Sequence, residues 1–161
     1  MNNLKTIDLE SEEQPYIYFI FGQDQKDIAE VDKVPVAVFN EDTKDEITKS
    51  LLKSIEPSTT LVSIKEDQNS ISDALFFEEA KYILKIPKGF GQALREGKED
   101  QRPIETLKAM DEGSVTVIES QIKQFFTLYK ANQLAEGGSL STEKEAAVLQ
   151  NIEKSFQDRI K

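Results

Sequence analysis

From Val34 onward, the sequence alternates apolar runs of strand length with stretches whose apolar residues recur every three or four positions. Short apolar runs indicate buried strands, and the three-to-four spacing is typical of a helix with one buried face. Strands that alternate with helices favour an α/β layer, because parallel strands need a crossover connection. We therefore expect a mostly parallel sheet of three to four strands with crossover helices, followed by two long C-terminal amphipathic helices.

The expected strands differ in how strongly the sequence marks them. The first has a nearly continuous apolar character, which predicts burial on both faces. The last is the most weakly marked. The four expected strands are Val34–Asn40, Thr60–Glu66, Tyr82–Ile86 and Ile104–Met110.

Helix boundaries are expected where capping residues, proline or glycine interrupt the apolar pattern. Pro57 ends the first helix, whose buried face is Ile47, Leu51 and Ile55, and Gly97 closes a short helix at residues 91–96. The expected N-terminal caps are Asp42 or Thr43 for the first helix, Ser70 with Asp73 for the second, and Thr142 with Glu145 for the last.

The two C-terminal helices are each expected to bury one apolar stripe. Gly137 and Gly138 separate them. The first stripe contains Val115, Ile118, Ile122, Phe125, Phe126 and Tyr129, and the second contains Leu149, Ile152, Phe156 and Ile160. The organisation that follows is an N-terminal segment and linker, 1–33, partly flexible, and a single α/β domain, 34–161.

The residue types in the chain exclude several classes of function. Thirty acidic residues against 20 basic ones give a formal charge of -10, which argues against nucleic acid and against adhesion to anionic lipid through a basic patch. The chain has no Cys, His or Trp, so thiol nucleophiles, Ser-His-Asp triads and ordinary zinc sites are excluded. We expect neither an enzyme nor a bound cofactor.

The most cation-like cluster is Asn40, Glu41 and Asp42, at the end of the first expected strand. Ligands gather at this end of open α/β sheets, and hard oxygen ligands suit calcium or magnesium. The spacing is not that of a calcium loop, however, and a turn with a helix cap explains all three residues. We favour the structural interpretation.

A second candidate is the segment Lys88–Gly91, which joins a strand to a helix N-terminus as phosphate-binding loops do. The Gly-Lys-Ser/Thr element and the third glycine of the dinucleotide fingerprint are both missing. We therefore interpret Gly89 and Gly91 as parts of an ordinary strand-to-helix turn and Phe90 as a core residue.

The aromatic residues Phe125, Phe126 and Tyr129 have two interpretations. Core packing is favoured for such a stripe, and a groove for an apolar substrate or a partner helix is the alternative. Position along the sequence does not decide between them.

Several segments together resemble the large extracytoplasmic loop of type-two (ABC-2) ABC transporter permeases, which are related to drug, sodium and peptide exporters. The resemblance rests on the order of its motifs and covers about residues 34–152. Its motifs are VAVFNED, SLLKSI, ALFFEEAKYILKIPKGFGQAL and SQIKQFF; within them, the family pattern corresponds to Val36–Asp42, Ser50–Ile55 and Ile86–Phe90. In that family these motifs look like fold markers, and no ligand residue carries over from them.

The resemblance implies a domain on the outer face of the cytoplasmic membrane that contributes to gating, assembly or cargo handling. The implied partners are the permease's membrane helices, a second permease half and a separate cytoplasmic ATPase subunit, with a homodimer as a further expectation. Tyr16–Phe21 resembles the tail of a first membrane helix, although it is far shorter than the ~20 residues needed to span a bilayer. The alternative is a freestanding soluble module that recognises a peptide or surface protein through the aromatic helix face.

Overall fold

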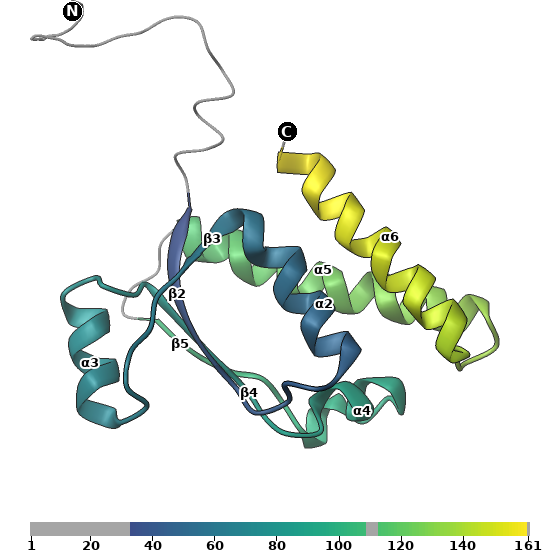
Figure 1. The fold of residues 1–161 in the computed structure, drawn as a ribbon, viewed down its shortest axis with the longest axis horizontal. Helices are drawn as coiled ribbons and strands as arrows, with labels where there is room; N and C mark the ends of the chain where they lie inside the picture. The colour runs from purple at the N-terminus through teal and green to yellow at the C-terminus, as the bar shows by residue number, and fades with distance from the viewer. Residues whose placement is uncertain (1–32, 109–112, 161) are drawn as a thin grey trace, which may run out of the picture. The chain divides into compact units, whose positions relative to one another are not determined.

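The computed structural model describes residues 33–108 and 113–160, in which four strands form one sheet in the order β3-β2-β4-β5 (Figure 1). β2 pairs in parallel with both β3 and β4, and β5 runs antiparallel to β4. The strands are β2 (Val34–Asn40), β3 (Thr59–Leu61), β4 (Tyr82–Ile86) and β5 (Glu105–Leu107). The predicted fold class, a mostly parallel four-stranded sheet with crossover helices and two C-terminal helices, is confirmed.

The two central strands have their predicted bounds, and the two edge strands are shorter than predicted. β3 ends at Leu61 instead of Glu66. The Val62 N–H still donates a hydrogen bond to the Val36 carbonyl, and beyond Val62 the chain leaves the sheet toward α3. β5 ends at Leu107, and residues 109–110 of the predicted strand lie outside the described residues. An edge strand has a neighbouring strand on one side only. The length of its apolar run in the sequence therefore does not fix how many of its residues pair.

Within the described ranges, five helices pack around the sheet, together with two short 3₁₀ segments, η1 (Glu56–Ser58) and η2 (Glu99–Gln101), that the sequence did not predict. Helices α2, α5 and α6 lie on one side of the sheet, and α3 lies on the other (Figure 1). The helices are α2 (Glu46–Ile55), α3 (Gln68–Phe76), α4 (Phe90–Arg95), α5 (Gly113–Ala135) and α6 (Thr142–Ile160).

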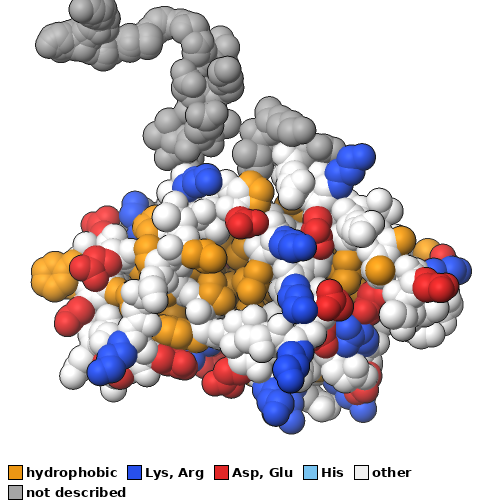
Figure 2. Space-filling model, viewed as in Figure 1, with side chains coloured by type: hydrophobic (Ala, Val, Ile, Leu, Met, Phe, Trp, Pro, Cys, Tyr) orange, Lys and Arg blue, Asp and Glu red, His pale blue; other side chains and the backbone are white. Residues whose placement is uncertain are grey.

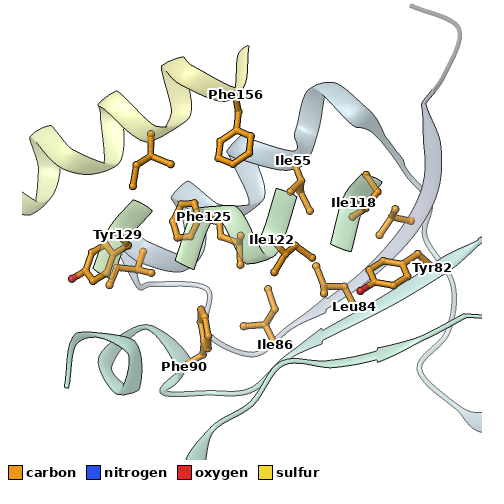
Figure 3. Close-up of a cluster of buried hydrophobic side chains, with 14 of the residues drawn as sticks. Ile55, Tyr82, Leu84, Ile86, Phe90, Ile118, Ile122, Phe125, Tyr129 and Phe156 are labelled. Carbon is orange, nitrogen blue, oxygen red and sulfur yellow. The ribbon is translucent and has the colours of Figure 1, made fainter. Parts of the chain in front are cut away.

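Side chains of β4 alternate between two cores, because successive residues of a strand point to opposite faces. On one face, Tyr82, Leu84 and Ile86 pack toward Ile122 and Phe125 of α5 (Figure 3). On the other face, Ile83 packs with Ala37 of β2 and with Ile71 and Ala74 of α3. The continuous apolar character of the central strands thus reflects burial on both faces.

All three predicted N-terminal caps are wrong. Asp45 caps α2, accepting a 2.9 Å hydrogen bond from the Ile47 N–H, and Asp67 caps α3 through the Ser70 N–H. For α6, Ser141 Oγ accepts from the Lys144 N–H. Ser, Thr, Asp and Asn cap comparably well, so where several stand close together the sequence does not choose among them.

No helix within the described ranges combines the length and the apolar character that crossing a bilayer requires.

Candidate functional site

Asp42 stands just beyond the carboxyl end of β2, beside the turn that follows β4. Its carboxylate accepts hydrogen bonds from the backbone N–H groups of Gly89 (3.0 Å) and Gly91 (2.9 Å) and from the Thr48 hydroxyl (2.7 Å). The two N–H groups at the start of α4 are the donors that a phosphate-binding turn would direct at an anion. Here the protein's own carboxylate takes that position, so the two sequence candidates, residues 40–42 and 88–91, form one structural joint.

The neighbours of Asp42 do not converge on a common point. Asn40 Oδ1 accepts from the Asp42 N–H at 2.7 Å, and the Glu41 N–H donates to the Ile86 carbonyl, which continues the pairing of β2 with β4. The Glu41 side chain is exposed and lines a separate hollow of about 230 Å³ with Glu66, Lys85 and Glu105. Among the described residues, no group of three or more acidic side chains is placed to hold a metal ion.

The electrostatics of Asp42 favour its charged form. Burial raises the pKa of this carboxyl, but the hydrogen bonds from Gly91, Thr48 and Gly89 and the charge of Arg95 outweigh burial and hold the pKa below its ordinary value. A carboxylate that already accepts three hydrogen bonds and stays ionised has little capacity to act as an acid or a base at neutral pH.

Arg95, near the end of α4, joins this joint to the helical layer. Its guanidinium donates to Asp45 through Nη1 (2.8 Å) and Nη2 (2.9 Å), and to Glu145 through Nε (2.8 Å) and Nη2 (3.0 Å). Glu145 is buried at 8% exposure and also accepts from the Tyr129 hydroxyl at 3.0 Å. One arginine therefore bridges α2 and α6, with α5 attached through Tyr129.

Two members of this network, Arg95 and Tyr129, are held in their ordinary protonated forms. The hydrogen bonds to Glu145 and then to Asp45 raise the pKa of Arg95 against the opposing effect of burial. Burial raises the pKa of Tyr129, and the charge of Glu145 raises it further. The network holds the helices together, with Arg95 charged and the Tyr129 hydroxyl protonated.

Two glycines make this close approach possible. A Cβ added to Gly91 would lie 2.2 Å from Asp45 Cγ, so any side chain at that position would collide with the Asp45 carboxylate. Gly89 has a φ of 87°, in the left-handed region that glycine adopts most readily. Both glycines of the Lys88–Gly91 segment thus have a structural explanation.

The aromatic stripe of α5 divides between core and surface. Phe125 and Tyr129 are buried in the core, in line with the favoured interpretation (Figure 3). Phe126 is only partly buried; its ring centroid lies 5.7 Å from that of Phe90, itself a core residue. Phe126 is therefore the member of the stripe that reaches an open space.

That space is a groove of about 560 Å³ between α5 and the segment that contains η2 and β5. Its lining is mostly apolar and also includes four charged side chains. The groove residues are Tyr82, Phe90, Glu99, Asp100, Pro103, Ile104, Thr106, Glu119, Ile122, Lys123 and Phe126. A pocket of this size and character can hold an apolar group.

Sequence reasoning missed Arg95, Asp45 and Glu145, the residues that organise the network. Glu145 was noticed only as a capping residue, whereas its side chain turns inward to Arg95 and Tyr129. The available signal was the position of Glu145, four residues before the buried Leu149 on the apolar side of α6. A charged residue on a buried helix face requires a partner, although the sequence does not say which.

No family model matches the chain, and no curated protein matches it. Among solved structures, a similar one is the crystal structure of "a domain of a putative ABC type-2 transporter from Thermotoga maritima MSB8". The two chains are 24% identical, the match covers 71% of this chain and 77% of the other, and the TM-score is 0.45.

Proposed function

We propose that this chain is the extracytoplasmic domain of a bacterial ABC-type export permease, where it contributes to gating, assembly or cargo handling without catalysis. The observation that carries the proposal is the joint at Asp42. Segments Val36–Asp42 and Ile86–Phe90, on which the resemblance to that family rests, meet through the hydrogen bonds of Asp42 to Gly89 and Gly91. If the family motifs maintain the fold and do not bind a ligand, their residues are expected to stabilise one another in this way.

The path of the chain supports the same proposal. β2 begins at Val34, and α6 packs against η1, the segment that leads into β3. Because β2 and β3 are parallel, the start of β2 and the last part of α6 lie at the same end of the sheet (Figure 1). A domain inserted between two membrane spans needs its two connections on one side.

In this proposal the domain depends on other chains for transport. Its partners are the permease's membrane helices, a second permease half and a separate cytoplasmic ATPase subunit. Pairing of this domain with a second copy is a further part of the proposal, and sedimentation at increasing concentration tests it: a dimer is expected, and a monomer throughout contradicts that part.

Placement on the outer face is testable because the chain contains no cysteine. In the complete protein in its native host, Lys98→Cys introduces a single thiol within this chain at an exposed position outside the Arg95 network. A membrane-impermeant maleimide should label it in intact cells. The matched control Leu84→Cys, in the core, should stay unlabelled until the protein is denatured. Labelling of Lys98→Cys only after lysis contradicts the proposal.

A second candidate function, a binding module that recognises a peptide or surface protein, is favoured by the groove beside Phe126. Its apolar lining would suit one or two apolar side chains of a partner. The neutral apolar dye Nile red is a suitable probe. We expect saturable binding that Phe126→Ser weakens about tenfold. The control Leu134→Ser, at an exposed leucine near the end of α5, should leave it unchanged, and equal weakening by both variants contradicts this candidate.

A further inference from the structure

Two neighbouring phenylalanines protrude from the far end of α3. Phe76 is 77% exposed and Phe77 is 66% exposed, and their rings meet edge to face with centroids 4.9 Å apart. In the space-filling view, apolar side chains stand out from the surface over this end of α3, at the left margin (Figure 2). Large apolar side chains that gather on a surface mark a place where something else binds.

The backbone holds this pair outward in a defined geometry. The Phe77 N–H donates to the Asp73 carbonyl, which closes the last turn of α3. Glu78 follows with a φ of 59°, which is uncommon for a residue that is not glycine. The Ala80 N–H then returns to the Ala74 carbonyl. The pair therefore sits on an ordered turn.

That turn lies at the end of the sheet where the chain enters it. The Lys81 N–H donates to the Pro35 carbonyl at 2.8 Å, so the turn adjoins the first residues of β2. Residues 1–32 join the described unit at Lys33, immediately before this contact. The last part of α6 lies at the same end of the sheet (Figure 1).

We propose that Phe76 and Phe77 form a membrane-contact surface that inserts into the headgroup region of a neutral lipid bilayer. The inference rests on the proposed function, in which both connections to the membrane leave from this end of the sheet. The turn adjoins the start of β2, so a membrane connection made through residues that precede β2 would meet the fold beside Phe76 and Phe77. Phenylalanine is among the side chains that interfacial helices bury at the boundary between headgroups and acyl chains.

The charges beside the pair select the kind of lipid. Glu78 and Glu79 follow it directly, and the nearby Lys81 is paired with Glu78 at 3.9 Å. With a formal charge of -10 for the chain, anionic headgroups would repel this surface, whereas phosphatidylcholine would not. The partner is therefore a zwitterionic lipid surface.

The absence of tryptophan provides a direct test. In the full chain, Phe77→Trp places the only indole on the proposed surface, and Leu134→Trp places it at the end of α5, where Leu134 is also 77% exposed. With phosphatidylcholine vesicles, the emission of Phe77→Trp should shift to the blue and that of Leu134→Trp should not. An unchanged Phe77→Trp emission, or a blue emission before lipid is added, overturns the inference.

A second measurement uses an otherwise unlabelled chain. Phe76→Ser with Phe77→Ser should lower the vesicle-bound fraction about tenfold, whereas Leu134→Ser should leave it unchanged. Phosphatidylglycerol added to the vesicles should weaken binding, and stronger binding at low salt overturns the choice of lipid. The outcome is independent of the Lys98→Cys labelling in cells, so a failure of the proposed function and a failure of this surface are told apart.

Discussion

The carboxyl edge of the sheet and the groove beside α5 differ in how far their polar groups satisfy one another. At the edge, Asp42, Asp45, Arg95 and Glu145 all have hydrogen-bond partners within the protein. In the groove, a mostly apolar lining surrounds about 560 Å³ of open space, and Oε1 of the lining residue Glu99 is buried without a hydrogen-bond partner. Open α/β sheets usually bind ligands at the carboxyl edge. In this chain the part of that edge around Asp42 is occupied by the protein's own side chains, and the larger of the two open spaces described above lies beside α5.

The difference teaches that a dense cluster of charged residues is not in itself a sign of a ligand site. What matters is whether donors and acceptors remain unmatched after folding. If the edge is structural and the groove is not, substitutions at the edge should mainly reduce stability, whereas substitutions at the groove margin should leave it unchanged.

Gly91→Ala should give the largest effect. The added Cβ would lie 2.2 Å from Asp45 Cγ and would push the Asp45 carboxylate away from Arg95. We expect a loss of about 3 kcal/mol in the free energy of unfolding, measured with urea. Gly113→Ala is the control, because a Cβ there meets nothing within 4 Å. Equal stability of the two variants would show that the edge tolerates rearrangement.

Arg95→Lys tests whether the fork geometry of the network matters, since it keeps the charge. A lysine cannot donate to both oxygens of two carboxylates at once, and it would leave the buried Glu145 incompletely paired. The expected loss in urea unfolding is about 2 kcal/mol. Arg102→Lys, at an exposed arginine, should change stability by less than about 0.5 kcal/mol. A similarly small loss for Arg95→Lys would show that the network contributes no more to stability than surface ion pairs do.

Asp42→Asn tests how the stability contributed by the carboxyl edge depends on pH. Because the folded-state pKa of Asp42 lies below its ordinary value of 3.8, its ionisation stabilises the fold fully above that value. The contribution is lost as pH falls from 3.8 through the folded-state pKa. At neutral pH the variant should lose about 1.5 kcal/mol, because an amide replaces a charged acceptor. The difference between the two proteins, followed by urea unfolding against pH, should shrink below pH 3.8; a constant difference would contradict the assignment.

Much of the fold was predictable because local patterns determine it. The runs Val34–Asn40 and Tyr82–Ile86 became the two central strands with unchanged bounds, since burial on both faces requires continuous apolar character. The stripe from Val115 to Tyr129 likewise marked the buried side of α5. Such patterns depend only on residues a few positions apart.

The candidate site was not predictable in the same way, because its contacts join distant residues. Arg95 meets Asp45 and Glu145, and the sequence separation is 50 residues in each case. With 30 acidic residues in the chain, charge alone does not select these two as the partners. A groove at the aromatic stripe was only the alternative interpretation, because the position of the groove depends on where α5 lies relative to β5 and η2.

The smallest expected effect concerns the groove margin. Lys123 lies on α5 beside the groove, and its side chain is exposed. Lys123→Gln keeps much of the side-chain length and removes the charge, so stability in urea should change by less than about 0.5 kcal/mol. Arg95→Gln, which removes one positive charge from the edge instead, provides the matched comparison and should be far more destabilising. If Lys123→Gln proved as costly as Arg95→Gln, the groove margin would also be part of the structural framework, and the contrast between the two regions would disappear.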